Sequence, residues 1–289
     1  MNLSEYFAQI AYQGPYDNPD LETLSRIQEH HIKSIPFENL SLHCGGTIVL
    51  NMEAGFEKLV RKKRGCCCVE NNGLLYWVLK EMGYNMLGTR LYQPSQEKYD
   101  ALITHLILLV TIDTKHYMAD AGFLSSYRFR QPLELMSGKE QPQLPGTFCL
   151  TEDNIIWYLD KIGRKLHIED RTNVSSSLLN KITHQKVYCF TVKPHRTEDF
   201  EKVLTCLLTS PKSVFLNVSI VCWQTTKGFN TLYGRTYSET ILNGEDGKDL
   251  MISKTLSDEE IQHVIKQKFN LILEKKLLPV NNFSHFLLE

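Results

Sequence analysis

Apolar side chains recur at helical spacing through the first third of the chain. Asp20 can cap a first helix, whose apolar positions lie three or four residues apart and which Pro36 ends. A second helical stripe covers residues 52–64, and a run of helix formers then begins near Cys68 and stops at Gly83. The first third is therefore predicted to be helical.

After Gly83 the pattern changes to short apolar runs separated by polar turns, which is typical of strands. Residues 104–110 form one run, and a polar turn at residues 113–115 separates it from a second run that ends at residue 120. Further candidate strands are residues 147–150, 155–159, 187–192 and 214–223. Successive short strands of this kind predict an antiparallel barrel or sandwich.

A last helix is predicted near the C-terminus. Ser257 and Glu260 have the spacing of a capping box, and an apolar face follows them up to Phe269. The polar residues 169–185 are expected to form a linker, and the tail from residue 279 onward is expected to be irregular. The chain thus combines separate helical and strand segments, as an α+β protein does.

Composition narrows the class of protein. The 289 residues are enough for about two domains, and acidic and basic residues nearly cancel at a formal charge of -1. Basic residues are spread along the chain, so nucleic acid is not expected as a partner. The N-terminus lacks the features of a secretory signal, and no apolar run has the length of a membrane span. The eight cysteines then favour a reducing, cytoplasmic compartment without disulfides.

Cys68 is the candidate nucleophile. It ends the run Arg64-Gly65-Cys66-Cys67-Cys68 at the start of a predicted helix. Unpaired backbone N–H groups and the positive end of the helix dipole favour thiolate over thiol there, and Arg64 adds positive charge nearby. Metal binding is the weaker interpretation of the cysteine run, because neighbouring side chains diverge and no C-x-x-C pair is present.

A nucleophilic thiol needs a base, and the base usually needs an orienting group. His105 and Asp120 can supply both. If the hairpin is centred between residues 113 and 114, position 120 lies opposite position 107, and the two side chains are diagonal neighbours on one face. A shift of the turn centre by half a residue would place them on opposite faces.

Each of these residues also has a purely structural interpretation. A histidine on an apolar strand is more often a core histidine, and an aspartate before Ala-Gly is more often a turn former. Adjacent cysteines can be small buried hydrophobes. Together, their Cys, His, Asp order also suits a cysteine hydrolase, so the residues alone leave both interpretations open.

Several stretches match one protein family in order and spacing. They are Ile35-Pro36-Phe37-Glu38-Asn39-Leu40, His43-Cys44-Gly45, Arg64-Gly65 through Cys68, Glu70-Asn71-Asn72, Thr104-His105-Leu106, Asp120-Ala121-Gly122-Phe123 and Gln131-Pro132-Leu133-Glu134-Leu135. The chain thereby resembles the arylamine N-acetyltransferases over essentially its whole length. Its length and its polar stretch near residues 169–185 resemble the vertebrate branch.

The resemblance implies a three-part α+β architecture. A helical domain over residues 1–84 would carry the nucleophile, and an antiparallel β-barrel over residues 85–192 would carry the histidine and the aspartate. An α/β lid and tail would follow over residues 193–289. The three side chains would form a Cys-His-Asp triad like that of the cysteine proteases.

The resemblance also implies a ping-pong acetyl transfer of the kind used in xenobiotic metabolism. Cys68 would attack the thioester of acetyl-CoA and pass the acetyl group to an arylamine, arylhydrazine or N-hydroxyarylamine. His105 would pair with the thiolate and Asp120 would fix the imidazole. Glu38 and Arg64 resemble a structural ion pair behind the active-site turn. The implied protein is a monomer that binds CoA and a small aromatic acceptor, and no metal or membrane.

Two further sets of residues match positions that contact the substrates in relatives. Those lining the acceptor site are Phe37, Thr104, Phe123, Ser125 and Tyr127. Those that contact CoA are Ala101, Leu102, Ser213 and His285. The chain departs from the family at Cys66 and Cys67, where Gly and an aromatic residue are usual. An exposed thiol at position 67 is expected to widen the cleft and to be open to oxidation.

Two alternatives use the same residues. A thiol amidase or peptidase would let water reach the thioester before an amine does. The lack of a secretory signal favours the transferase over a secreted or lysosomal thiol protease. A binding module that has lost its activity is the third possibility, and the presence of Cys68, His105 and Asp120 at the matching positions argues against it.

Overall fold

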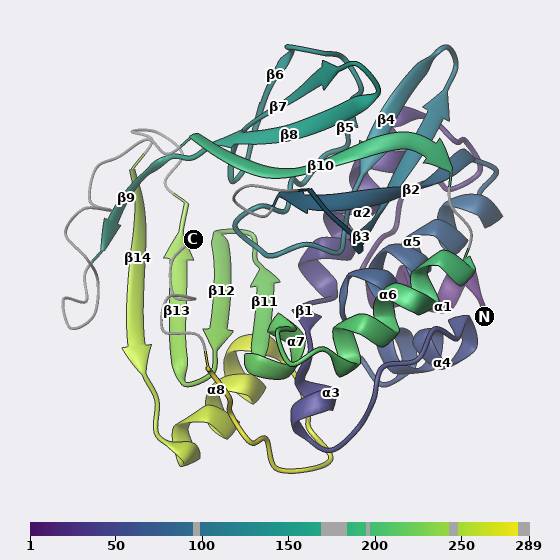
Figure 1. Ribbon diagram of the computed structural model, residues 1–289. Helices are drawn as coiled ribbons and strands as arrows, with labels where there is room; N and C mark the ends of the chain where they lie inside the picture. The colour runs from purple at the N-terminus through teal and green to yellow at the C-terminus, as the bar shows by residue number, and fades with distance from the viewer. Residues whose placement is uncertain (95–98, 169–183, 195–196, 243–247, 283–289) are drawn as a thin grey trace.

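The computed structural model describes residues 1–94, 99–168, 184–194, 197–242 and 248–282 of the protein. The first third is helical, as predicted, and Figure 1 shows these helices in the right half of the view. They are α1 (Leu3–Gln9), α2 (Leu21–Ser34), α3 (Leu40–His43), α4 (Met52–Phe56), the π-helical turn η1 (Glu57–Arg61) and α5 (Cys68–Glu81). The stripe predicted over residues 52–64 thus forms α4 and η1.

The ends of the helices follow the expected signals. The Asp20 side chain accepts a hydrogen bond from Thr23 N at 2.8 Å and caps α2. This helix ends where Ile35 turns extended ahead of Pro36. Helix α5 ends just before Gly83, whose φ of +85° lies in the left-handed region that glycine favours.

Eight strands form one antiparallel sheet, drawn at the top of Figure 1. They are β2 (Asn85–Pro94), β3 (Tyr99–Ile112), β4 (Lys115–Ala119), β5 (Leu133–Glu134), β6 (Glu140–Gln143), β7 (Gly146–Asp153), β8 (Ile156–Ile162) and β10 (His184–Pro194). Their order is β5-β4-β3-β2-β10-β8-β7-β6. The strands predicted over residues 104–110, 116–120, 147–150, 155–159 and 187–192 all belong to this sheet.

Glutamine side chains connect the two edges of this sheet. Gln141 on β6 accepts from Glu134 N at 2.8 Å and donates to Glu134 O at 3.0 Å. Gln143 makes the same pair of bonds with the backbone of Gln131, at 2.7 and 3.0 Å. Side-chain amides therefore replace a backbone ladder between β5 and β6, and the first and last strands lie against each other.

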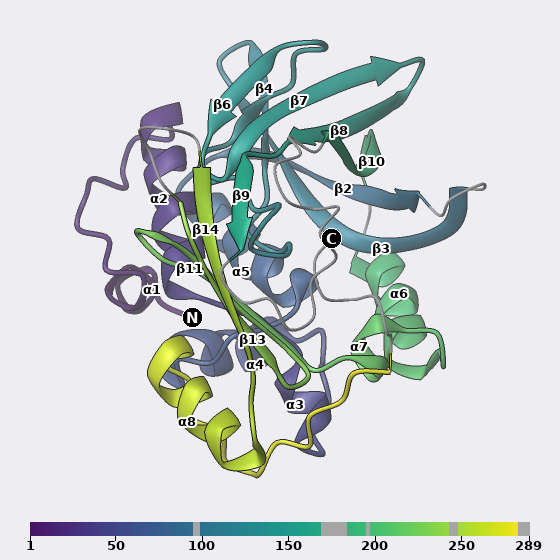
Figure 2. The same ribbon diagram turned by 90° about the vertical axis from the view of Figure 1, so that its left-hand side faces the viewer.

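A second sheet has six strands in the order β1-β11-β12-β13-β14-β9. Its strands are β1 (Phe37–Glu38), β9 (Lys165–Ile168), β11 (Ile220–Gln224), β12 (Gly228–Tyr233), β13 (Thr236–Ile241) and β14 (Lys248–Thr255). The helices of this half are α6 (Thr197–Thr209), α7 (Val214–Asn217) and α8 (Asp258–Phe269). Because β1 comes from the helical third and β9 follows β8, this sheet joins all parts of the chain. Figure 2 shows β9 beside β14 at one edge of the sheet.

The strand predicted over residues 214–223 is partly wrong. Only its second half is a strand, and residues 214–217 form the single helical turn α7. Ser213 caps this turn by accepting from Phe215 N at 3.2 Å, and Asn217 donates to Ser213 O at 2.8 Å. Local polar side chains thus satisfy the backbone in a helical form that the apolar run did not reveal. The capping box of Ser257 and Glu260 at α8 is confirmed.

The apolar cluster around the start of α5 positions the candidate site. It brings Cys67 and Cys68 together with Leu106 of β3, Phe200 and Leu204 of α6, and Phe215 of α7. No helix among the described residues has the length and apolar character needed to cross a membrane. Most of the predicted linker, residues 169–183, lies outside the described residues.

Candidate active site

The turn that precedes α5 is held against β1. Cys66 N donates to Pro36 O at 3.2 Å, and Glu38 N donates to Cys66 O at 2.9 Å. A Cβ atom at Gly65 would lie 2.5 Å from Pro36 O, so no larger residue fits at this position without moving the backbone. The backbone pairing therefore fixes the direction in which the chain enters the helix.

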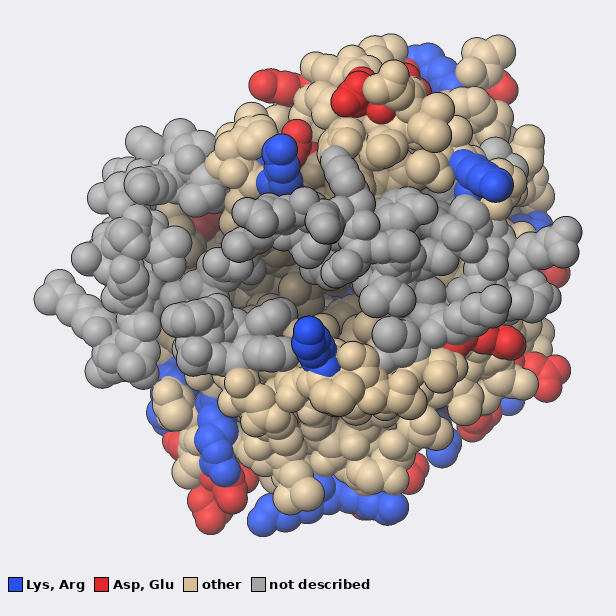
Figure 3. All heavy atoms as spheres, in the orientation of Figure 1, with Lys and Arg blue, Asp and Glu red and all other residues tan. Residues whose placement is uncertain are grey.

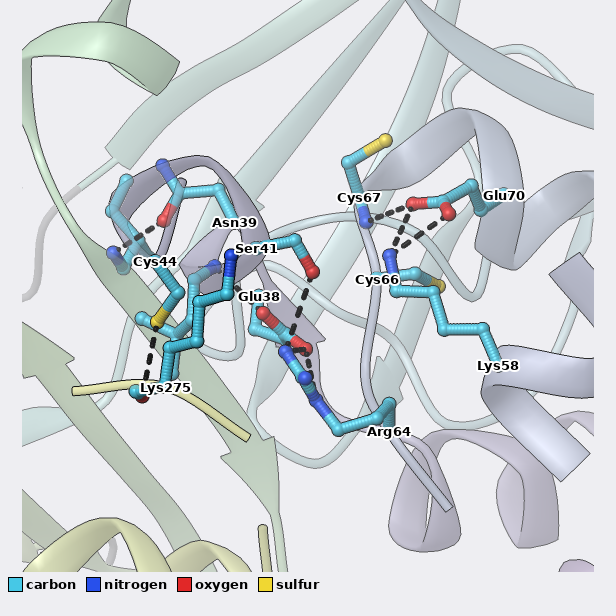
Figure 4. Close-up of polar contacts among 12 residues, drawn as sticks. Glu38, Asn39, Ser41, Cys44, Lys58, Arg64, Cys66, Cys67, Glu70 and Lys275 are labelled. Carbon is cyan, nitrogen blue, oxygen red and sulfur yellow. Dashed lines mark hydrogen bonds and ion pairs between the residues drawn. The ribbon is translucent and has the colours of Figure 1, made fainter. Parts of the chain in front are cut away.

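Two ion pairs brace the same turn from either side (Figure 4). Arg64 Nη2 lies 2.7 Å from Glu38 Oε1, so the structural ion pair expected from the sequence is present. Glu70 accepts from the backbone N of Cys67 at 3.3 Å and pairs with Lys58 Nζ at 2.9 Å. Because the Arg64 guanidinium is turned toward Glu38, it belongs to the support of the turn.

The register of the β3–β4 hairpin is the predicted one. Leu108 pairs with Ala119, and Ile112 with Lys115, which centres the turn between residues 113 and 114. His105 Nε2 lies 2.8 Å from Asp120 Oδ2, and both side chains are almost completely buried. The predicted diagonal contact between them is confirmed.

Four neighbours fix the Asp120 carboxylate. Oδ2 accepts from His105 and from the Tyr188 hydroxyl at 2.9 Å, while Oδ1 accepts from Asn72 Nδ2 at 2.8 Å and from Gly122 N at 2.9 Å. Burial raises the pKa of Asp120, but the charge and hydrogen bond of His105, with the bonds from Asn72 and Gly122, outweigh it and hold the pKa below its usual value. The carboxylate is therefore ionised and oriented.

Cys68 and His105 form the second half of this arrangement. A hydrogen bond with Cys67 lowers the pKa of Cys68, burial opposes that effect, and the hydrogen bond and charge of His105 lower the pKa further, to about 5. Burial lowers the pKa of His105, but Asp120 and Cys68 together raise it to about 10. Both shifts favour a thiolate beside an imidazolium, which is the activated form of a thiol nucleophile.

Gly122 lets the loop after β4 approach the nucleophile. A Cβ atom at this position would lie 2.8 Å from Cys68 Cα and 2.8 Å from Cys68 O. Asn72, one helical turn after Cys68, accepts from Ala121 N at 2.7 Å and joins α5 to the same loop. The start of α5 and the Asp120 loop are thus locked together at backbone contact.

Aromatic rings stand beside the histidine. The Phe123 ring meets the His105 ring edge-on, with ring centroids 4.9 Å apart, and it contacts Tyr188 at 5.3 Å and Tyr127 at 6.0 Å. Ser125, between the two aromatic positions of this loop, is buried. Phe123, Ser125 and Tyr127, which sequence matching assigned to the acceptor site, therefore lie in one loop that begins at Asp120.

The other residues predicted to contact the substrates lie outside this loop. Phe37 packs against Phe215 of α7 with ring centroids 6.2 Å apart, and Ser213 caps α7. Ala101, Leu102 and Thr104 lie on strand β3, where the backbone is described but these side chains are not, and His285 lies outside the described residues. Figure 3 shows a hollow near the centre of the view, where the eight-stranded sheet lies above β11 and β12 in Figure 1.

The expectation that Cys67 is exposed is wrong. Its accessible fraction is 1%, because the apolar cluster formed with α6 and α7 covers it. In Figure 4 its side chain points away from Cys66 and Lys58. The cysteines whose side chains are described are all free thiols. Within those same residues, no group of three or more His, Cys, Asp or Glu side chains is placed to hold a metal ion.

Sequence reasoning did not assign a role to Asn72, Gly122 or Tyr188. Asn72 had a usable signal, because a residue four positions after Cys68 shares its helix face. No such signal was present in the sequence for Tyr188, because the residue lies 68 positions from Asp120 along the chain. The close approach of Gly122 depends on two segments meeting in space.

Comparison with known proteins defines the class. A sequence model of the N-acetyltransferase family matches residues 20–278. The chain is 49% identical over 283 residues to the arylamine N-acetyltransferase pineal gland isozyme NAT-10 of Gallus gallus, covering 97% of this chain and 98% of that protein. It is 44% identical over 288 residues to arylamine N-acetyltransferase 1 of Homo sapiens, covering 99% of each. The chain therefore belongs to the arylamine N-acetyltransferase family, whose members are acyltransferases.

Solved structures agree with this assignment. The arylamine N-acetyltransferase of M. smegmatis superimposes with a TM-score of 0.79 at 28% identity, covering 94% of this chain and 93% of that one. The Mycobacterium marinum enzyme, solved in complex with CoA, shares the fold with a TM-score of 0.77 at 24% identity, covering 93% of each chain. The mixed helix and sheet architecture is therefore that of the family.

Proposed function

We propose that the protein transfers an acetyl group from acetyl-CoA to an arylamine, arylhydrazine or N-hydroxyarylamine by a ping-pong mechanism through an acetyl-Cys68 thioester. The observation that carries this proposal is the buried Cys68 together with His105, whose Nε2 lies 2.8 Å from the Asp120 carboxylate and whose hydrogen bond and charge lower the pKa of the thiol. Family membership supplies the reaction class, and the geometry supports the roles of the three residues.

In the first half-reaction the Cys68 sulfur attacks the acetyl carbonyl, and the bond between that carbon and the CoA sulfur breaks. His105, which starts as an imidazolium, gives its proton to the departing CoA thiolate. In the second half-reaction the acceptor nitrogen attacks the thioester and His105 takes a proton from it. Cys68 leaves as the thiolate, so both partners return to their starting charge, and Asp120 holds the imidazole throughout.

Substrate contacts belong to the same proposal. Phe37, Phe123, Ser125, Tyr127 and Thr104 would face the aromatic acceptor. Phe37 shares an apolar cluster with Cys68, and the Phe123 ring meets His105, with Ser125 and Tyr127 following it in the same loop. The CoA contacts would be Ala101, Leu102, Ser213 and His285, and the CoA complex of the M. marinum relative supports CoA as the carrier of the acetyl group.

The predicted architecture gives each part of the chain a task. In this proposal residues 1–84 carry the nucleophile, the eight-stranded sheet within residues 85–192 acts as a barrel that carries His105 and Asp120, and residues 193–289 act as the lid. The protein would work as a cytoplasmic monomer without a metal.

A thiol amidase or peptidase with the same three residues is the alternative. Hydrolysis requires water at the thioester. Cys68 is 3% exposed and packs in one apolar cluster with Phe200, Leu204 and Phe215, an environment that disfavours water. This packing favours transfer to an aromatic amine.

Intact-mass spectrometry after mixing the protein with acetyl-CoA alone tests the proposal. We expect one added acetyl group, mapped by peptide analysis to Cys68, which disappears when an arylamine is added. An unlabelled protein, or an acetyl group mapped to Cys67, would reject the assignment.

A further inference from the structure

The segment between β4 and β5 carries three of the proposed acceptor contacts but has no helix or strand of its own. We call residues 120–131 the acceptor loop. It contains Phe123, Ser125 and Tyr127. A loop without regular structure owes its shape to contacts with other elements, so the groups that hold it also decide where these side chains lie.

Buried polar side chains from three separate elements hold the carbonyl groups of the acceptor loop. The pairs are Gln28 Nε2 with Phe129 O at 2.9 Å, Lys161 Nζ with Ser126 O at 2.5 Å, and Gln224 Nε2 with Ser125 O at 2.9 Å. They come from α2, β8 and β11. Lys161 is the charged member of this set.

The Lys161 side chain is closely packed between β7 and the acceptor loop. Its side chain is 6% exposed, and Nζ lies 5.5 Å from the centroid of the Tyr127 ring, within the range of a cation–π contact. Gly146 on β7 makes room for it, since a Cβ atom there would lie 2.7 Å from Lys161 Cε. The ammonium therefore holds both the backbone and the ring of the acceptor loop.

Few charges face this ammonium. Its cross-strand neighbours, Phe148 on β7 and Gln185 on β10, are uncharged. Asp249 on β14 acts on it from a distance but makes its close ion pair with Arg164, at 2.9 Å. Burial lowers the pKa of Lys161 to about 8, although Asp249 raises it. Tyr127 is the titratable side chain of the loop in contact with it.

We propose that Lys161 is a positioning residue that sets acceptor selectivity, because its buried ammonium fixes Ser126 and the Tyr127 ring and thereby holds that ring against Phe123. The inference rests on the proposed acetyl transfer and deepens it. The contacts of Lys161 are with Ser126 and Tyr127 of the acceptor loop and with β7, so we expect the first half-reaction not to depend on it.

Lys161→Met keeps much of the apolar length of the side chain and removes both the charge and the donor. We expect the KM for a one-ring arylamine to rise about fivefold, because the ring that borders it is no longer held, an estimate in line with the loss of one charged hydrogen bond that is partly replaced. The specificity constant for a one-ring acceptor divided by that for a two-ring acceptor should fall by a similar factor. The rate of Cys68 acetylation by acetyl-CoA should not change.

The pH dependence separates positioning from a merely structural role. In the wild type the ratio of specificity constants for the two acceptors should fall between pH 7 and pH 9, because the ammonium loses its proton in this interval. The thiolate and imidazolium keep their charges over it, since the pKa of Cys68 is about 5 and that of His105 is about 10. Lys161→Arg keeps the charge and should show the wild-type KM at pH 7 with a ratio that no longer changes up to pH 9.

Lys115→Met is the matched control. Its ammonium pairs with Glu134 at the surface, with a side chain that is 58% exposed, and its loss should leave both acceptors unaffected. If a folded Lys161→Met protein has the wild-type ratio of specificity constants for the one-ring and two-ring acceptors, the proposal is overturned. If that variant does not fold, a wild-type ratio that stays constant from pH 7 to pH 9 overturns it. A wild-type protein that takes up no acetyl group would instead reject the proposed function.

Discussion

The nucleophile turn and the acceptor loop meet at the same site but are held in opposite ways. The turn at residues 64–68 is held by Glu70 and Asn71 of its own helix and by the neighbouring strand β1, whose Glu38 lies 26 residues from Arg64. The acceptor loop is braced by Gln28, Lys161 and Gln224, which lie 101, 35 and 99 residues from the carbonyl groups that they hold. The support of the nucleophile turn thus comes mainly from nearby sequence, and the support of the acceptor loop largely from distant sequence.

This difference predicts that the two regions can be altered independently. Changes near the turn should alter the acetylation of Cys68, whereas changes in the distant braces should alter the use of the acceptor. Asp120 is the exception, because it begins the loop and contacts both Asn72 of α5 and His105 of β3.

The largest effect is expected at this shared residue. Asp120→Asn keeps the size of the side chain but removes the charge that stabilises the imidazolium and favours the wrong tautomer of His105. Acetylation of Cys68 and overall turnover should both fall by about three to four orders of magnitude, as in other triads. Single-turnover kinetics with circular dichroism as the folding control measures this. Near-normal turnover in a folded variant would reject the triad.

Asn72→Ala should give the next largest effect and should act on the first half-reaction. The change removes the bonds to Asp120 Oδ1 and Ala121 N, at 2.8 and 2.7 Å, and leaves buried polar groups without these partners. We expect Cys68 acetylation to slow by about tenfold and unfolding stability to fall by about 1–3 kcal/mol. The test is to measure the rate of Cys68 acetylation and the KM for the acceptor in the wild type and in the Asn72→Ala variant. If only the KM for the acceptor changed, the nucleophile turn and the acceptor loop would not be altered independently in the way that we expect.

Gln224→Leu makes the complementary change in a distant brace. The Gln224 side chain is buried and donates to the carbonyl groups of Ser125 and Arg128. Without this side chain a buried carbonyl group lacks its donor, and the loop should be displaced as a result. We therefore expect the KM for the acceptor to rise about fivefold. Cys68 acetylation should stay within twofold of the wild type, a margin that covers ordinary kinetic error. Slowed acetylation with an unchanged acceptor KM would show that the loop supports the nucleophile instead.

The same difference explains what the sequence predicted. The start of α5 at Cys68 and the hairpin register that joins His105 to Asp120 follow from caps, turn position and alternation within short stretches. Lys161 and Tyr188 join the site only when separate strands are brought together, and neither has a distinctive local pattern. The one helical turn at α7 was missed because an apolar run of this length does not distinguish a strand from a short helix.

Cys67 offers the smallest and most local test. Its hydrogen bond with Cys68 lowers the pKa of the nucleophile, as the hydrogen bond and charge of His105 also do. Cys67→Ala should therefore raise the pKa of Cys68, and the loss of thiolate should grow as the pH falls toward 5. Because His105 still favours the thiolate, acetylation at pH 7.5 should change by about twofold or less, within the range expected for one weak thiol donor.

Alkylation of Cys68 by iodoacetamide between pH 4 and pH 8, followed by peptide mapping, measures this shift directly. Cys67→Ser keeps a donor and should retain the wild-type midpoint. Cys66→Ala removes a neighbouring buried thiol that belongs to the apolar core behind the turn, and it should leave the midpoint unchanged. If Cys67→Ala also leaves it unchanged, His105 alone sets the thiolate, and the support of the nucleophile comes from β3 as much as from its own helix.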